Sequence, residues 1–281
     1  MKLVQTIAEM RALCRAAKSG SKRLGLVPTM GALHAGHLSL VQAARSKSDV
    51  VAASIFVNPT QFGPNEDFAR YPRNLENDSA ILEREGVQLV FAPSVEEMYP
   101  AGSVTWVAVE GLSDRLCGKS RPGHFRGVTT VVAKLFHIIE PDFAFFGQKD
   151  AAQHAIIRRM ARDLNMPVSI EVCPIVREAN GLALSSRNAY LNPEERKSAL
   201  VLHHSLTRVQ QLYEAGERDS GRLTSAAKNE FATEPAVRLD YFEAVDPDTL
   251  ESQSQVGKKT LVAVAAFVGK TRLIDNVVLG A

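Results

Sequence analysis

Residues 50–57 read VVAASIFV, a run that is apolar apart from Ser54 and shows no alternation of polar and apolar side chains. A strand in the middle of a parallel sheet has helices on both faces, so both sides of such a strand must be apolar. On both sides of this run, short apolar stretches alternate with segments of helical spacing. This pattern predicts a doubly wound, Rossmann-like α/β domain.

The same domain is expected to contain further strands and helices. The predicted strands cover residues 24–27, 88–92, 104–109, 143–146 and 168–172. The predicted helices cover residues 7–17, 37–46, 75–85, 128–139 and 151–165. Apart from the first, each of these helices lies between two predicted strands, which is how consecutive parallel strands are joined.

The pattern changes after Val176. Asn192, followed by Pro193 and two acidic residues, is a strong helix start, and this helix is predicted to continue to residue 214. Three β-like runs follow at residues 239–245, 260–268 and 272–279, and the last two are close enough for a hairpin. The sequence therefore predicts a domain at residues 1–176, a small α+β C-terminal domain at residues 177–281, and a hinge at residues 177–186.

Composition excludes several classes of protein. A net charge of +2 over 281 residues is too small to indicate nucleic-acid binding. The longest apolar run, residues 261–268, is less than half of the about 20 residues that span a membrane. Charged residues at positions 9, 11 and 15 argue against a signal peptide, and the three cysteines form no C-x-x-C pair. We therefore expect a cytoplasmic protein with reduced thiols.

The segment PTMGALHAGH, residues 28–37, leaves a predicted strand and opens a helix. Backbone N–H groups and the helix dipole favour phosphate at such a place, and Gly31 and Gly36 permit close approach of a ligand. His34 and His37 can donate to phosphate oxygens and stabilise a departing pyrophosphate. The alternative is that both histidines only cap the helix. Because strand, turn and helix occur together, a nucleotide site is favoured; a zinc site is not, since the metalloprotease spacing is absent.

Two further loops lie where they can face the same ligand. FGQKD, residues 146–150, follows another buried strand, and Lys149 there is a point charge suited to a β- or γ-phosphate. Alternatively, Asp150 is a helix N-cap with Gln153 as its partner. GLALSSRN, residues 181–188, has hydroxyls and an arginine that can close over phosphate, or it is a polar hinge with serine caps.

For two more stretches the sequence does not decide between a role in the ligand site and an ordinary surface loop. Gln61 follows the strand at residues 50–57 and is expected to point into the crevice, although an Asn-Pro turn in a surface loop is the alternative. Residues 115–126 contain five basic side chains and are either a solvated loop or a screen for a triphosphate.

Five separated motifs carry a resemblance over the whole chain: PTMGALHAGH, NPTQFGPNEDFARYPR, RPGHFRGVTTVVAKLF, FGQKDAAQ and GLALSSRN. In order and spacing they are similar to those of the pantoate–β-alanine ligases, within the superfamily of HxGH nucleotidyltransferases. That family's loop usually reads His-Glu-Gly-His, and here Ala35 takes the place of the Glu. Asn180 stands where Asp is common.

The resemblance implies ATP-dependent condensation of (R)-pantoate with β-alanine to pantothenate, AMP and pyrophosphate, through an enzyme-bound pantoyl adenylate. It implies Mg²⁺ with the ATP, no protein metal site that the sequence identifies, and a homodimer. The implied ATP-binding residues are Met30, Gly31, Ala32, Leu33, His34, Ala35, Gly36, His37, Gly147, Gln148, Lys149, Asp150, Val176, Leu184, Ser185, Ser186 and Arg187.

Within that set, the resemblance assigns catalysis to His37, assisted by His34, and to Lys149, which together with residues 185–187 also holds the phosphates. Gln61 and Gln153 are implied to hold pantoate, since neutral amides bind hydroxyls and a carboxylate without adding a rival nucleophile. Two other functions stay open. One is an adenylyl- or cytidylyltransferase for a phosphorylated acceptor, which shares the HxGH loop and predicts a cationic acceptor pocket. The other is a non-catalytic nucleotide sensor, which would not need both histidines and Lys149 together.

Overall fold

The computed structural model describes residues 1–280. Its larger sheet is parallel and has the strand order β1-β4-β3-β2-β5-β6. The strands are β1 (Lys2–Val4), β2 (Leu24–Thr29), β3 (Val50–Ile55), β4 (Leu89–Phe91), β5 (Phe143–Gly147) and β6 (Ser169–Cys173). From β2 the chain first builds the sheet outward through β3 and β4, and then returns to place β5 on the other side of β2. The strand order therefore reverses between β2 and β5, where open α/β sheets bind their ligands.

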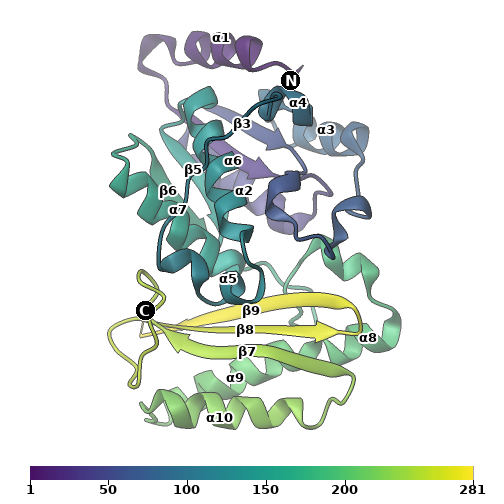
Figure 1. Ribbon diagram of the computed structural model, residues 1–281, viewed down its shortest axis with the longest axis vertical. Helices are drawn as coiled ribbons and strands as arrows, with labels where there is room; N and C mark the ends of the chain where they lie inside the picture. Colours follow the sequence, from purple (N-terminus) through teal and green to yellow (C-terminus); the bar gives the residue numbers. More distant parts are fainter. Residues whose placement is uncertain (281) are drawn as a thin grey trace.

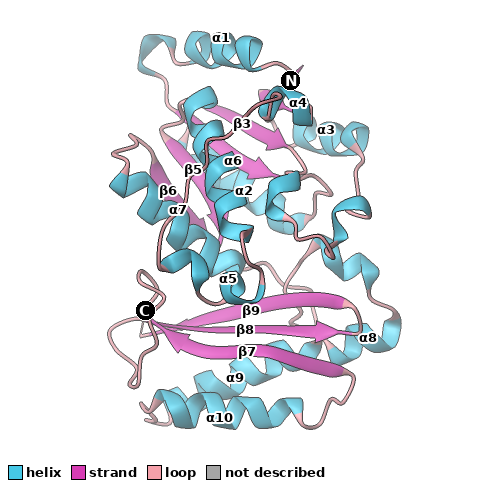
Figure 2. Ribbon diagram, in the orientation of Figure 1, coloured by secondary structure: helices cyan, strands magenta, loops and turns pink. Residues whose placement is uncertain are grey.

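Helices cover both faces of this sheet (Figures 1 and 2). They are α1 (Ile7–Ala17), α2 (Ala35–Lys47), α3 (Leu75–Arg84), α4 (Val95–Met98), α5 (Cys117–Ser120), α6 (His124–Ile139) and α7 (Ala151–Asp163). Neighbouring residues of β2 show the two faces: Leu26 belongs to the core that includes α1, α6 and α7, whereas Val27 belongs to the core that includes α2 and α3. Ala52 and Ala53 of β3 divide in the same way, which confirms the predicted doubly wound fold.

The C-terminal part contains a three-stranded antiparallel sheet, β7-β8-β9. Its elements are α8 (Pro193–Ser198), α9 (Leu200–Glu214), α10 (Ser220–Phe231), β7 (Val237–Val245), β8 (Thr260–Val268) and β9 (Thr271–Leu279). The sheet lies between the larger domain and helices α9 and α10 (Figure 1). Leu261 and Ala263 of β8 join the core of the larger domain, so the two parts share an apolar contact. The predicted α+β architecture is confirmed.

Four local predictions were wrong. Residues 104–109 form no strand: Val107 donates its N–H to the Thr130 hydroxyl on α6, and its carbonyl accepts from Thr129. Val107 and Val109 pack against the core that includes α6, and not within the sheet. The sequence prediction also missed β1, started α6 four residues late, and joined α8 to α9, which the structure separates at Ala199.

Candidate active site

The loop after β2 is held in place from behind by a buried carboxylate. Gly31 has a φ of 82° and Ala32 a φ of 52°, so the chain makes a tight left-handed turn here. Asp78 of α3 accepts hydrogen bonds from the backbone N–H groups of Ala32, at 2.8 Å, and of Leu33, at 3.0 Å. With these two N–H groups bound behind the loop, its other side, which leads into α2, faces the crevice.

The two histidines of this loop cap α2. Nδ1 of His34 accepts from the N–H of Gly36 at 3.1 Å, and Nδ1 of His37 accepts from the N–H of His34 at 3.3 Å. The rings lie side by side, with centroids 4.1 Å apart. Because each Nδ1 is an acceptor, the neutral rings must hold their proton on Nε2. Capping is therefore compatible with ligand binding, since it uses neither Nε2–H donor.

Both rings are neutral near pH 7. Burial, followed by the charges of His34 and Lys149, lowers the pKa of His37 to about 3. Burial and the charge of Lys149 lower the pKa of His34 to about 4. The site therefore presents two uncharged N–H donors beside one fixed cation, an arrangement suited to an anionic ligand.

Lys149 lies in the 3-10 turn Gln148–Asp150 between β5 and α7. Its Nζ is 3.3 Å from Oδ2 of Asp150. Burial acts to raise the pKa of Asp150, but the charge of Lys149 and its hydrogen bond outweigh burial, and the pKa is lowered. Asp150 makes no side-chain hydrogen bond to the start of α7, so the alternative role of an N-cap is not supported.

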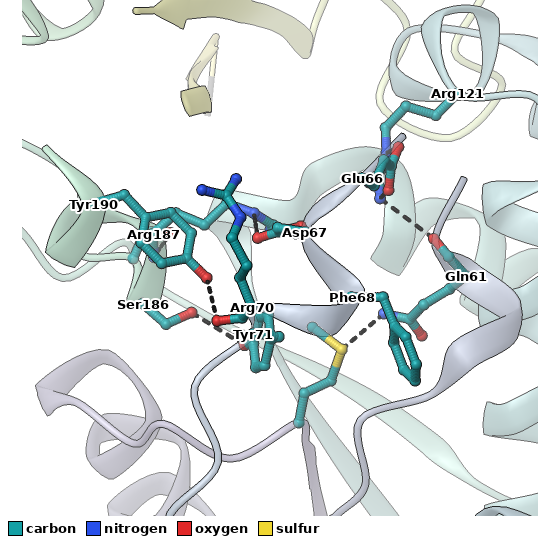
Figure 3. Close-up of polar contacts among 12 residues, drawn as sticks. Gln61, Glu66, Asp67, Phe68, Arg70, Tyr71, Arg121, Ser186, Arg187 and Tyr190 are labelled. Carbon is teal, nitrogen blue, oxygen red and sulfur yellow. Dashed lines mark hydrogen bonds and ion pairs between the residues drawn. The ribbon is translucent and has the colours of Figure 1, made fainter. Parts of the chain in front are cut away.

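The third segment is held against residues 67–71, as Figure 3 shows. Arg187 donates from Nε and Nη2 to the two carboxylate oxygens of Asp67, at 3.0 and 2.9 Å. Burial opposes ionisation of Asp67, yet the hydrogen bonds and charge of Arg187 keep its pKa below the usual value. The Ser186 hydroxyl lies 3.0 Å from that of Tyr71. The predicted phosphate-binding arginine therefore already has an anionic partner.

One cavity connects most of the predicted residues. Those that line it are Met30, His34, Gly36, His37, Gln61, Gly147, Lys149, Asp150, Gln153, Val176, Leu184, Ser185, Ser186 and Arg187. Five others do not line it: Gly31, Ala32, Leu33, Ala35 and Gln148. The structure thus brings together side chains that are far apart in the sequence, at the place where the strand order reverses.

Gln61 and Gln153 line the same cavity, and Gln61 is held in a defined orientation. Its Oε1 accepts from Asn58 Nδ2 at 3.1 Å, and its Nε2 donates to the Met30 sulfur at 3.0 Å. Asn58 is 1% exposed and accepts from the Tyr99 hydroxyl at 2.9 Å. The sequence prediction treated Asn58 only as part of a turn, although an amide directly after a buried strand was a usable signal.

Known proteins are similar to this sequence over almost its whole length. Residues 2–278 match the family described as Pantoate-beta-alanine ligase. The chain belongs to this family. It is 61% identical over 281 residues to the pantothenate synthetase of Koribacter versatilis, covering 100% of this chain and 97% of that one. The pantothenate synthetase of Thermotoga neapolitana is 56% identical over 280 residues, with 100% of both chains covered.

Two solved structures of the same family are similar over nearly the whole chain. Pantothenate synthetase from Thermus thermophilus gives a TM-score of 0.94 at 47% identity, with 99% of both chains covered. Pantoate-beta-alanine ligase from Francisella tularensis, complexed with beta-gamma ATP and beta-alanine, gives 0.80 at 34% identity, with 99% of this chain and 97% of that chain covered. This chain is therefore a ligase, and the transferase and sensor alternatives no longer apply.

In this ligase the basic stretch at residues 115–126 braces Gln61 from outside the cavity. Arg121 forms an ion pair with Glu66 and donates to the Gln61 carbonyl, and Nδ1 of His124 lies 2.8 Å from the same carbonyl oxygen. No residue from 115 to 126 lines the cavity that contains the two loop histidines, but Arg121 and His124 border an adjoining cavity together with Lys149 and Arg187. The sequence left the role of this stretch open, and the contacts of Arg121 show that its charge is bound to the loop that carries Gln61.

Three wider predictions concern metals, membranes and thiols. Within residues 1–280, no group of three or more His, Cys, Asp or Glu side chains is arranged to hold a metal ion. In the same part of the chain, no helix has both the length and the apolar character to cross a membrane. Cys14, Cys117 and Cys173 are buried free thiols, as the sequence predicted.

Proposed function

We propose that this ligase joins (R)-pantoate to β-alanine through an enzyme-bound pantoyl adenylate. A carboxylate does not react with amines, because oxide is a very poor leaving group. In the first step, a pantoate carboxylate oxygen bonds to the α-phosphorus of ATP, and the bond from that phosphorus to the bridging oxygen breaks, releasing pyrophosphate. In the second step, the β-alanine amine bonds to the acyl carbon and loses a proton, the C–O bond breaks, and the oxygen leaves with AMP.

The observation that carries this proposal is the composition of the cavity. His34, His37 and Lys149 line it, and so do residues 185–187, which follow β6 in the chain. Neutral amides, Gln61 and Gln153, line the same cavity. Donors and cations suit a triphosphate, whereas amides suit a small hydroxy acid. This division supports ATP in the phosphate part and pantoate beside it, with carboxylate and α-phosphorus adjacent.

The two Nε2–H groups of the histidines act where charge develops. The bond that breaks leaves a pyrophosphate, and a preorganised donor that binds this charge lowers the barrier more than it tightens ATP binding. His37 is assigned the larger part, with His34 assisting, and Lys149 holds the β- and γ-phosphates. Met30, residues 147–150, Val176 and Leu184 complete the proposed ATP site.

Arg187 must change partner during this reaction. In the structure it binds Asp67, at 2.9 and 3.0 Å. In the proposed complex it binds a phosphate group, which offers the same bidentate geometry. Residues 177–281 then act as a lid on the domain of residues 1–176, with the hinge at residues 177–186. The contact between Ser186 and Tyr71 is part of the closed wall.

The remaining assignments concern the metal ion, the oligomeric state and the cellular location. Mg²⁺ is assigned to the substrate, because phosphate oxygens are its preferred ligands. Asp150, which lines the cavity, and Asp67, which binds Arg187, already have cationic partners. A homodimer fits the extended segment at residues 104–109, where Val104 is 83% and Trp106 44% exposed. A cytoplasmic location supplies ATP and keeps the thiols reduced.

Isotope transfer tests the adenylate. Pantoate labelled with ¹⁸O in its carboxylate is incubated with ATP, β-alanine and the enzyme, and the products are analysed by mass spectrometry. The proposal predicts one labelled oxygen in AMP and none in pyrophosphate. Formation of ADP with label in inorganic phosphate would show an acyl phosphate and overturn the proposal. A reaction without enzyme controls for chemical exchange of the label.

A further inference from the structure

Asn276 lies on β9 of the C-terminal sheet, is 3% exposed, and contacts the turn that contains Lys149. Its Nδ2 donates to two backbone carbonyls of that turn, those of Gln148 at 2.9 Å and Lys149 at 3.0 Å. Its Oδ1 accepts from Nε2 of Gln148, also at 2.9 Å. One buried amide therefore makes three hydrogen bonds to two consecutive residues, 127 and 128 positions away in the sequence.

The turn itself has little local support from side chains. Gly147 precedes it and has none, and Asp150 makes no capping bond to α7. A 3-10 turn also has poorer hydrogen-bond geometry than an α-helix. The bonds from Asn276 thus come from the other part of the chain, and they fix the backbone from which the Lys149 side chain extends.

The residue before Asn276 makes a parallel connection. Asp275 accepts from both terminal nitrogens of Arg177, at 2.6 and 2.9 Å, and Arg177 also donates to the Gly181 carbonyl at 3.0 Å. Gly181 begins the segment that continues to residues 185–187. Two adjacent residues of β9 therefore hold both walls of the phosphate site, one through the lysine turn and one through the lid segment.

We propose that Asn276 is a positioning residue that sets the place of Lys149 relative to residues 185–187. This inference rests on the proposed role of Lys149 in binding phosphate. Asn276 does not line the cavity that holds the two loop histidines, but it borders an adjoining cavity together with Lys149, Ser185 and Arg187. Its side-chain amide is hydrogen-bonded to the lysine turn, so it acts through that turn. Because it belongs to the C-terminal sheet, it also makes the position of Lys149 depend on how the two parts of the protein are docked.

The expected effect of losing these bonds falls on the chemical step. Asn276→Ala leaves two carbonyls of the turn without their partner and allows the turn to shift. A misplacement of about 1 Å can cost roughly 100-fold in rate, so adenylation is expected to slow by about 10- to 100-fold. The KM for pantoate is expected to change less than about threefold, because Gln61 is held by Asn58 and Met30 and not by this turn.

A double-mutant cycle tests the inference. Single-turnover adenylation is measured for the wild type, Asn276→Ala, Lys149→Ala and the double variant, and each unfolding temperature is recorded. If Asn276 acts through Lys149, its loss in the Lys149→Ala background slows adenylation by less than about threefold further. Val268→Ala, a buried truncation elsewhere in the same sheet, is the control for lowered stability and is expected to keep the wild-type rate.

The outcomes separate this inference from the proposed function. Additive losses in the double variant, or a wild-type rate in Asn276→Ala when Lys149→Ala is inactive, would overturn the role of Asn276. A wild-type rate in Lys149→Ala would instead refute the proposed role of that lysine. Asn276→Asp keeps the volume but loses both donated bonds, so it is expected to match Asn276→Ala and serves if the alanine variant does not fold. A wild-type rate in Asn276→Asp contradicts the inference.

Discussion

Replacing His37 in two ways separates the capping role of its imidazole from the proposed catalytic role. Nδ1 accepts from the N–H of His34 at 3.3 Å, and the cap makes no use of Nε2–H. In His37→Asn the side-chain oxygen lies near the position of Nδ1, which keeps the cap and removes the donor. In His37→Gln the amide nitrogen reaches the position of Nε2, which keeps a donor and weakens the cap.

Loss of the catalytic role is expected to lower the rate, and loss of the capping role is expected to lower the stability, by different amounts. Loss of one preorganised donor at a developing charge costs about 10²- to 10³-fold in rate, or roughly 3–4 kcal/mol. Loss of a cap costs about 0.5–2 kcal/mol of stability, and the 3.3 Å length of this bond places it at the low end. His37→Asn is therefore expected to unfold close to the wild type and to adenylate pantoate at least about 100-fold more slowly. His37→Gln is expected to lose stability and keep more of the rate.

Rapid-quench measurement of adenylate formation, together with thermal unfolding, checks both numbers. His204→Asn, at an exposed histidine of α9, is the matched control and is expected to leave both unchanged. Adenylation by His37→Asn within about threefold of the wild-type rate would remove the Nε2–H donor from the mechanism. Equal slowing in both His37 variants would show that loop geometry, and not the donor, limits the reaction.

Three further predictions follow from the same contacts. Asp67→Asn removes the carboxylate that competes with phosphate for Arg187, so calorimetry is expected to show ATP bound about tenfold more tightly. This change lies within the energy of a charged hydrogen bond. Unchanged or weaker ATP binding would contradict the exchange of Asp67 for phosphate at Arg187. Gln153→Ala is expected to raise the KM for pantoate by about tenfold or more and to leave ATP binding unchanged; an unaltered KM removes Gln153 from the pantoate site. The free energy of unfolding is expected to fall as pH drops from about 6.5 towards 4, since unfolded histidine takes up a proton near pH 6.5 while the folded pKa values of His34 and His37 are about 4 and 3. Urea unfolding at about pH 7 and about pH 5 measures this loss of unfolding free energy. The loss between the two pH values is expected to be smaller in His37→Asn than in the wild type. An equal loss in His37→Asn would contradict the neutral state of His37 in the folded protein.

The parallel sheet could be predicted because a strand that is buried on both faces appears in the sequence as a continuous apolar run. Val51, Ala52 and Ala53 are all buried, and their apolar run needed no knowledge of what covers them. The short β1 has one buried residue, Val4, which is too little for any periodicity to show. Residues 104–109 form an apolar run like that of a strand, but the backbone groups of Val107 bind side chains of α6, and no local pattern reveals that partner.

Some residues of the candidate site could also be predicted from the sequence, and others could not. His34, His37 and Lys149 follow the ends of β2 and β5, and the carboxyl ends of neighbouring parallel strands meet at one edge, so the order of elements was enough to bring them together. Asp67 and Asn276 were missed because their roles depend on partners 120 or more positions away in the sequence. Isolated polar residues of this kind gain a function only from the tertiary structure.

Exchange of labelled pyrophosphate into ATP tests the central claim most directly. The enzyme is incubated with ATP, Mg²⁺, labelled pyrophosphate and pantoate, with β-alanine left out. If pantoate is activated as an adenylate before the amine is needed, label enters ATP in this mixture, and no exchange occurs without pantoate. Exchange that requires β-alanine, or ADP as the nucleotide product, would contradict the stepwise adenylate mechanism.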